Sequence, residues 1–426
     1  MTYTKLNNLV GWAVFAVATL TYGLTVEPTA SFWDCGEFIA TANELEVPHP
    51  PGAPLHLLTG RLFALAGHLL GGPEQVALAV NWVSVLASAA LALFICWTTT
   101  LLAKRVLAPA AAEPDRGTQA VILFSGAVAG LTCTFLDTVW FNAVEAEVYA
   151  YSSAFTAAVF WLMLKWEARA DQPGSNRWLI LLAYLIGLAV GVHLLPLLTI
   201  PALALIYYFK KYNYSRTGVA VAFGAGVLIL GLVQFGVVQK TWDIAWAFER
   251  TLVGTENWDG NAKSGLGLPM GSGVLLFTLV LLGALGYGIY YTYRRQRVNA
   301  HLGLLALLMV YLGFSSYAII AIRSNTNPAI NQNGPGNVLN FLSYVKREQY
   351  GSAPLLFGQM YNSQVIDYQK KGKNYLYLDS HDRYIVDGDK LGYKYDRASQ
   401  RFFPRMHNPD HYESGPFGYK RYVSNL

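Results

Sequence analysis

The chain has 426 residues, of which 54% are hydrophobic and 13% are charged, and its mean hydropathy is +0.31. Because soluble domains carry about 25% charged residues, this composition excludes an ordinary soluble protein and indicates a polytopic membrane protein. The net charge of +5 does not indicate nucleic-acid binding, since the basic residues gather at the ends of apolar runs, where membrane topology accounts for them. Three scattered cysteines exclude a conventional disulfide framework.

The first apolar run lies near residues 9–24 and follows Lys5, which predicts one membrane crossing. A cleavable signal peptide ending near Ala30 is the alternative, because a basic residue before an apolar stretch fits that class too. In both cases the next loop, residues 25–54, lies outside. No Lys or Arg occurs between Lys5 and Arg61, so the acids of this loop have no nearby basic partner in the sequence.

Residues 55–70 are predicted to form an amphipathic helix in the outer membrane interface. Leucines recur there at helical spacing, whereas most polar residues fall off that stripe. The stripe consists of Leu55, Leu58, Leu62, Leu65 and Leu69. Several prolines before it stiffen the connection and end any preceding helix.

The remaining apolar runs are long enough, or nearly so, to cross a hydrocarbon core of ~30 Å. They lie near residues 76–103, 119–136, 148–164, 217–239, 270–293 and 302–322. A longer run from Trp178 to Phe209 contains His193 and Pro196 near its middle, which predicts two crossings joined by a tight external turn. We therefore expect about nine crossings.

Basic residues support this topology, because they gather in alternate loops on one side of the predicted bundle. They are Lys104, Arg105, Arg116, Lys165, Arg169, Arg177, Lys210, Lys211, Arg216, Arg294, Arg295 and Arg297. By the positive-inside rule this side is cytoplasmic, which places the acidic loop outside.

After Ile322 the sequence becomes polar and rich in tyrosine, and Asn-Pro and Gly-Pro pairs signal turns. We expect an all-α polytopic membrane domain over residues 1–322. Residues 323–426 are predicted to form a small external polar tail, or the start of a longer C-terminal region. Short strands are expected at 375–378 and 383–386.

Polar residues from several external connections converge on one face of this topology, as expected of an enzyme whose substrate arrives partly from the lipid. The candidate site residues are Asp34, Glu37, His49, Glu145, Glu147, Tyr149, His193, Arg323 and Arg347. Asp34 and Glu37 lie three residues apart, so on a helix they share one face and can bind an acceptor hydroxyl or a cation together. A capping box at the start of a helix is the alternative for this pair.

The other candidates also have structural alternatives. Glu145 and Glu147 open the next helix, where the macrodipole favours acids, and at most one of them is expected to face the site. His193 either binds a phosphate or satisfies backbone groups at the turn near Pro196. Arg323 either binds a lipid phosphate or extends its side chain to the interface, and Arg347 either shares that role or is a surface charge.

Five segments together resemble a known family. They are Phe-Trp-Asp-Cys-Gly-Glu-Phe (32–38), His-Pro-Pro-Gly-Ala-Pro (49–54), Phe-Asn-Ala-Val-Glu-Ala-Glu-Val-Tyr (141–149), Gly-Val-His (191–193) and Lys-Arg-Glu-Gln-Tyr-Gly (346–351). The chain resembles a bacterial membrane family, formerly of unknown function, that is similar to an animal endoplasmic-reticulum protein O-mannosyltransferase and belongs with the GT-C glycosyltransferases.

The resemblance implies a GT-C-like helical bundle with its site on the external face, a polyprenyl-phosphate sugar donor and an aspartate base in the first loop, which Asp34 matches. We expect transfer of a sugar, with mannose as one candidate, to a Ser or Thr hydroxyl of an exported protein, with inversion. Location in a bacterial inner membrane with a periplasmic active site is also expected.

Within this mechanism each candidate has an expected role. Asp34 and Glu37 are the expected catalytic residues. The expected substrate-binding residues are His49, Glu145, Glu147 and Tyr149, and the expected ligands of the donor phosphate are His193, Arg323 and Arg347. No cofactor is expected and no metal is required in this mechanism, although a divalent cation held by Glu37 or Glu147 stays an alternative. The sequence contains no P-loop, dinucleotide fingerprint or His-rich metal spacing, which disfavours a nucleotide-driven pump.

Two rival interpretations remain. A transporter or lipid-carrier flippase would use intramembrane acids as proton or ion relays, but here the acids lie at helix ends. A structural membrane component whose tail binds partners would have the Asp34 loop buried without an adjoining cavity.

Overall fold

The computed structural model describes residues 2–109, 113–260, 263–351, 354, 356–360, 363–380 and 382–404. These residues fall into two compact units. The first lies within Met1–Asp243 and Thr278–Gly336, and the second within Ile244–Phe277 and Asn337–Leu426. All candidate site residues except Arg347 belong to the first unit.

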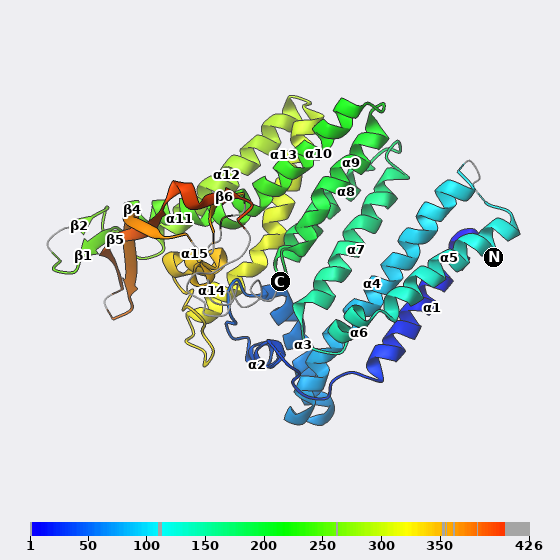
Figure 1. The fold of residues 1–426 in the computed structure, drawn as a ribbon, viewed down its shortest axis with the longest axis horizontal. Coiled ribbons are helices and arrows are strands. Elements are labelled where there is room, and N and C mark those ends of the chain that lie inside the picture. Colours follow the sequence, from blue (N-terminus) through cyan, green and yellow to red (C-terminus); the bar gives the residue numbers. More distant parts are fainter. Residues whose placement is uncertain are drawn as a thin grey trace. The chain divides into compact units, whose positions relative to one another are not determined.

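Helices dominate the chain, as the composition predicts (Figure 1). They are α1 (Tyr3–Gly23), α2 (Cys35–Glu44), α3 (Pro54–Gly71), α4 (Val76–Leu107), α5 (Arg116–Thr134), α6 (Asp137–Ala143), α7 (Val148–Glu167), α8 (Asn176–Val190), α9 (Ile200–Lys211), α10 (Arg216–Gly231), α11 (Thr241–Leu252), α12 (Ser272–Arg294), α13 (Val298–Phe314), α14 (Ala318–Ser324) and α15 (Val338–Lys346). A π-helical segment, Leu232–Lys240, joins α10 to α11.

Within the described residues, five helical segments are long and apolar enough to cross a membrane. They are Pro73–Leu107, Arg116–Thr134, Arg216–Leu252, Ser272–Arg294 and Val298–Ser324. The chain is therefore an integral membrane protein. The other predicted crossings coincide with α1, α7, α8 and α9, so the total of nine stays a prediction.

Local sequence explains several helix ends. Asp115 caps α5 by accepting hydrogen bonds from the amides of Gly117 and Thr118, and Ser215 caps α10 through the amide of Gly218. The long apolar run breaks where Pro196 predicts, because α8 ends at Val190 and α9 begins at Ile200 after a short 3₁₀ segment. That break creates the turn containing His193.

Small residues allow close helix packing in the first unit, where the long helices stand side by side (Figure 1). Gly187 of α8 faces the backbone of Val310, and Gly313 of α13 faces the backbone at Gly187 and Leu188. Because a side chain at either glycine would overlap backbone atoms, the two helices approach each other through these positions. Gly130 of α5 packs in the same way against the Ala92 carbonyl of α4.

The second unit contains a four-stranded sheet in the order β2-β1-β5-β4 and a two-stranded pair. The strands are β1 (Thr255–Asn257), β2 (Lys263–Ser264), β3 (Phe357–Gln359), β4 (Val365–Leu378), β5 (Arg383–Tyr395) and β6 (Gln400–Phe402). β4 and β5 pair antiparallel, with Leu376 opposite Ile385, so they contain the two predicted strands but extend well beyond them.

The buried side chain of Glu249 joins two elements of this unit. Its carboxylate accepts hydrogen bonds from the amides of Gly271, Gly273 and Val274 at the start of α12, over distances of 2.6–3.1 Å. A carboxylate at a helix N-terminus is favoured by the exposed amides and the helix dipole. Glu249 therefore has a structural role in this unit.

The close contact between α8 and α13 predicts that alanine substitutions at two glycines of α13 affect thermal stability differently. Gly313→Ala should lower the thermal unfolding midpoint, because overpacking typically costs about 1–3 kcal/mol. Gly303→Ala has open space around its added methyl group and should leave the midpoint unchanged or raise it, since alanine is favoured over glycine in helices by about 1 kcal/mol. Thermal unfolding of both variants in detergent measures this, and equal shifts would contradict the packing argument.

Candidate active site

The acidic site, formed by Asp34, Glu37, His49, Glu145 and Glu147, is built around α2, which is held at its C-terminal end by α14 and the segment that follows it. Leu45 adopts a left-handed conformation (φ 52°) that ends α2. The Arg323 guanidinium donates hydrogen bonds to the carbonyls of Leu45 at 2.6 Å and Glu44 at 3.0 Å. The Val47 amide donates to the Ile330 carbonyl at 2.9 Å. Arg323 therefore binds the exposed end of a helix, while its predicted phosphate contact stays a prediction.

Asp34 stands at the N-cap position of α2, but its side chain makes no capping hydrogen bond. The side chain is 56% exposed, and His49 Nε2 lies 3.9 Å from Asp34 Oδ2. That distance is too long for a direct hydrogen bond. The capping alternative is therefore not realised by Asp34, whose carboxylate is accessible to a substrate.

Glu37 and His49 are bound to each other more tightly. The His49 amide donates to Glu37 Oε1 at 2.8 Å, and His49 Nδ1 lies 2.6 Å from Glu37 Oε2. Burial raises the pKa of Glu37, but the hydrogen bonds and the charge of His49 together outweigh burial, so the net effect is a lowered pKa. Glu37 is thus held ionised, and it fixes the orientation of the His49 ring.

Two buried acids lie beneath the start of α2. Glu145 is 2% exposed and Glu147 is 5% exposed. Glu147 caps α7 by accepting a hydrogen bond from the Val148 amide at 3.3 Å, and the Cys35 thiol lies 3.9 Å from its Oε1. Burial, followed by the negative charge of Asp34, raises the pKa of Glu147 to about 7. Burial and the neighbouring Glu145 and Glu147 raise the pKa of the Cys35 thiol to about 12, so it stays protonated.

The turn after α8 joins the same site. The Leu55 amide donates to the Gly191 carbonyl at 2.8 Å, and Val192 packs in a core cluster with Phe38. His193 Nδ1 accepts a hydrogen bond from the Leu195 amide at 3.1 Å, and its ring lies 5.4 Å from that of Tyr149. The backbone alternative for His193 is therefore realised, and its predicted phosphate contact remains untested.

Arg347 belongs to the second unit. It ends α15 in a left-handed conformation (φ 57°), and its guanidinium lies 4.7 Å from the centre of the Tyr350 ring. These contacts explain its place in the fold of that unit, and its predicted role in phosphate binding stays a prediction.

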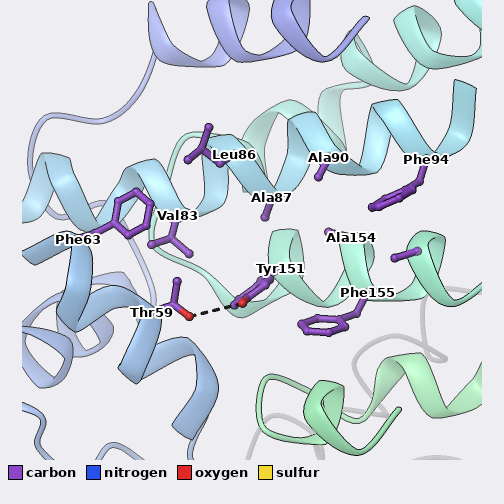
Figure 2. Close-up of a pocket in the computed structure, with 11 residues that line it drawn as sticks. Thr59, Phe63, Val83, Leu86, Ala87, Ala90, Phe94, Tyr151, Ala154 and Phe155 are labelled. Atoms are coloured by element: carbon purple, nitrogen blue, oxygen red, sulfur yellow. Dashed lines mark hydrogen bonds between the residues drawn. The ribbon is translucent and has the colours of Figure 1, made fainter. Parts of the chain in front are cut away.

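An apolar cavity of about 340 Å³ lies between α3, α4 and α7 (Figure 2). Its lining residues are Thr59, Phe63, Val83, Leu86, Ala87, Ala90, Phe94, Tyr151, Ala154, Phe155 and Ala158. Thr59 and Tyr151 provide the polar groups, and their hydroxyl oxygens lie 3.5 Å apart. Tyr151 follows Glu147 by four residues along one helix, so the cavity begins about one turn, ~6 Å, from the acidic site.

His56 lies in the layer between the cavity and the acids, and sequence reasoning did not select it. Its ring packs 5.3 Å from Phe38 and 6.4 Å from Tyr151. It is completely buried, and within the described chain neither ring nitrogen has a hydrogen-bond partner. Burial lowers the pKa of His56 to about 4, so the ring is neutral at neutral pH. The leucine pattern of α3 does not predict that the His56 side chain is buried.

A helix is present over residues 55–70, as α3, and much of its predicted leucine stripe lies on the exposed face. Leu62, Leu65 and Leu69 are 68%, 42% and 87% exposed, whereas Leu57 is buried. Such an exposed leucine stripe is suited to contact with lipid. Location of α3 in the membrane interface stays a prediction.

Asp34, Glu37 and His49 also offer one metal-ligand atom each, and these atoms lie within 4.8 Å of one another. Carboxylate oxygens and an imidazole nitrogen suit several divalent cations. The expectation of a metal-independent site stays a prediction, which chelation can test.

Comparisons with known proteins match two parts of the chain to protein families. Residues 34–216 match the family described as protein O-mannosyl-transferase TMEM260 N-terminal domain, and residues 351–425 match a family of unknown function. The protein O-mannosyl-transferase tmem260 of Dictyostelium discoideum is 25% identical over 150 residues, which is 35% of this chain and 16% of that protein. No solved structure matches the chain. The predicted relation to the protein O-mannosyltransferases is confirmed, although the chain spans about a sixth of this relative.

The raised pKa of Glu147 predicts how stability depends on pH. Between pH 4.5, its ordinary pKa, and about 7, the folded protein binds a proton that the unfolded chain does not. The contribution of Glu147 to the free energy of unfolding is therefore full below pH 4.5 and is lost as the pH rises to about 7, by at most about 3 kcal/mol. Glu147→Gln should flatten this part of the profile. Thermal unfolding in detergent between pH 4.5 and 8 measures it, with the exposed Glu74→Gln as control, and parallel wild-type and Glu147→Gln profiles would exclude this titration.

Proposed function

We propose that this protein is a membrane glycosyltransferase that moves a sugar from a polyprenyl-phosphate donor to a Ser or Thr hydroxyl of an exported protein. The observation that carries the proposal is the exposed Asp34 carboxylate, which makes no capping bond and lies near Glu147, about one helical turn before Tyr151 in the lining of an apolar cavity. The relation of residues 34–216 to protein O-mannosyltransferases supports this function and makes mannose the first sugar to test.

Asp34 is the general base in this reaction. The acceptor hydroxyl lies about 3 Å from Asp34 Oδ2 and gives its proton to that oxygen as its own oxygen forms a bond to the anomeric carbon. The bond from that carbon to the phosphate oxygen breaks, and the phosphate leaves with the electron pair. Attack opposite the leaving group inverts the anomeric centre. Glu37 contributes indirectly, because it orients His49 beside the acceptor position.

The buried acids favour this assignment. Because the pKa of Glu147 is raised to about 7, Glu147 holds a proton for much of the time at neutral pH. Proton binding there limits the negative charge that accumulates beside Asp34. In this proposal Tyr149 and His49 border the space in which the sugar and the acceptor meet, and the buried Glu145 lies beneath it.

The cavity between α3, α4 and α7 is suited to the lipid part of the donor. Its lining is almost wholly apolar, and aromatic rings from Phe63, Phe94 and Phe155 line it. A polyprenyl chain is a branched hydrocarbon that also dissolves in the bilayer, so its binding in the cavity depends on van der Waals packing against these rings rather than on removal from water. In this proposal the donor phosphate lies between the cavity and the acids, and His49 and His193 are its expected ligands.

A transporter or flippase is the alternative, and the position of the acids disfavours it. A relay across a membrane needs ionisable groups in the interior of the helices. Glu147 instead lies before α7, and Asp34 and Glu37 lie at the start of the short helix α2. The charge pattern and the family resemblance support a location of the chemistry at the periplasmic face of a bacterial inner membrane, which we propose.

Asp34→Asn should remove sugar transfer while leaving expression and membrane insertion intact. Loss of a positioned general base typically lowers the rate by 10² to 10⁴, and the amide keeps the shape of the side chain. Transfer of radiolabelled mannose from polyprenyl-phosphate mannose to exported proteins measures this. Glu44→Gln, an exposed change at the other end of α2, is the matched control.

Retained activity in Asp34→Asn would remove this residue from the mechanism. The same assay with and without EDTA tests the metal: loss of transfer on chelation, restored by a divalent cation, would contradict the metal-independent reaction. Absence of transfer from every lipid-linked sugar by the wild-type protein would contradict the proposed function itself.

Filling the apolar cavity should weaken binding of the donor and should not slow the chemical step. Ala90→Phe places a ring in the space meant for the chain; because overfilling a packed site costs about 1–3 kcal/mol, the KM for a long-chain donor should rise roughly 5- to 150-fold. kcat should change little. Val121→Phe, at an exposed position of α5, adds the same ring away from the cavity. Equal KM values for the two variants would exclude the cavity as the lipid site.

A further inference from the structure

A second apolar cavity, of about 620 Å³, lies between α7, α8, α9 and α10. Its lining includes Leu179, Ile186, Tyr208, Tyr212, Gly218 and Ile229, and nearly all of its wall is carbon. The volume is within the ~300–1,000 Å³ range of small-molecule sites. Neither the proposed reaction nor the matched families give this cavity a role.

The walls of this cavity are held by specific contacts. Tyr207 stacks on the buried Trp166 ring at 5.2 Å. Tyr208 Oη accepts a hydrogen bond from the Ser215 amide at 2.9 Å and donates to the Asn213 carbonyl at 2.8 Å. A methyl group on Gly218 would overlap the Tyr208 hydroxyl, so this glycine makes room for the ring. The end of α9 and the start of α10 are thus fixed at the cavity mouth.

The cavity has the depth of one membrane leaflet. Its lining on α10 runs from Gly218 near the start of the helix to Ile229, eleven residues later. At 1.5 Å per residue this is ~16 Å, about half of the ~30 Å hydrocarbon core. A lipid chain entering at the start of α10 would reach about the middle of the bilayer.

Cations surround the mouth. Lys210 and Lys211 lie at the end of α9, 2.6 Å and 3.8 Å from Asp171. Arg177 and Arg216 stand in the first turns of α8 and α10, and both are exposed. Among the residues that the structure describes, neither arginine has an ion-pair partner. The mouth therefore keeps an excess of positive charge, on the side that the charge pattern predicts to be cytoplasmic.

We propose that this cavity binds an acyl chain of an anionic phospholipid from the cytoplasmic leaflet, with the headgroup phosphate held by Arg177 and Arg216. An apolar slot of leaflet depth selects a lipid chain, and basic residues at its mouth select an anionic headgroup. α8 runs from this mouth to the turn at Gly191 beside the acidic site, so the two lie at opposite ends of one helix. This site is therefore separate from the donor cavity.

Lipid retention tests the proposal without any assay of sugar transfer. The full chain is placed in vesicles of phosphatidylglycerol and phosphatidylcholine, extracted in mild detergent, and analysed by native mass spectrometry. The wild-type protein should retain phosphatidylglycerol in preference to phosphatidylcholine. The double variant Arg177→Gln and Arg216→Gln should lose about 30-fold in this preference, since each basic residue contributes ~1 kcal/mol near an anionic surface.

Two matched controls distinguish lipid binding in this cavity from a general effect of surface charge or of an added ring. The double variant Arg294→Gln and Arg295→Gln removes the same charge from the end of α12 and should retain the preference. Ala225→Phe fills the cavity and should abolish retention, whereas Val227→Phe adds the same ring to an exposed position of α10 outside the lining and should not.

Equal losses in the two arginine double variants, or unchanged retention in Ala225→Phe, would overturn the proposal. Retention of both lipids to the same extent by the wild-type protein would also overturn it. Each of these outcomes leaves the glycosyltransferase proposal unaffected, because no residue changed here contacts the acidic site.

Discussion

The position of Asp34 depends on the attachment of the short helix α2 at both ends. At its end, Arg323 binds the carbonyls of Glu44 and Leu45, which the helix itself leaves without partners. Near its start, Cys35 lies beside the carboxylate of Glu147. Hydrogen bonds to charged groups contribute about 1.5–3 kcal/mol each, and a ten-residue helix is marginal alone in water. The position of Asp34 therefore depends on these tertiary contacts rather than on the stability of α2 alone.

The carboxyl groups at this site differ in pKa although they are chemically alike. Glu37 keeps its charge because His49 supplies hydrogen bonds and a compensating proton, whereas Glu147 tends to be protonated because it is buried near Asp34. His49 is hydrogen-bonded to Glu37 and lies 3.9 Å from Asp34. Such separation of similar acids by their environments is typical of active sites. This difference in protonation limits the repulsion between acids that lie close together in the folded protein.

Much of the architecture could be predicted from local patterns. Apolar runs predict the long helices, Pro196 predicts the break after α8, and the acidic loop contains the candidate base. Contacts between distant residues could not be predicted, because no local pattern encodes them. Arg323 contacts Leu45, which is 278 residues away, and Thr59 meets Tyr151 at a separation of 92. The spacing of Glu147 and Tyr151 was available in the sequence, but nothing there indicated a cavity beside Tyr151.

The proposed reaction must bring together a lipid-bound donor and a water-soluble acceptor, and this requirement explains the position of the site. A sugar drawn into the hydrocarbon core would lose its hydrogen bonds to water, and an acid there would be strongly disfavoured. A site in bulk water would expose the polyprenyl chain. The change from carboxylates around Glu147 to carbon around Tyr151 takes place within one turn of α7, ~6 Å. A phosphate lies between sugar and lipid in the donor, so this short transition is where its two parts separate by polarity.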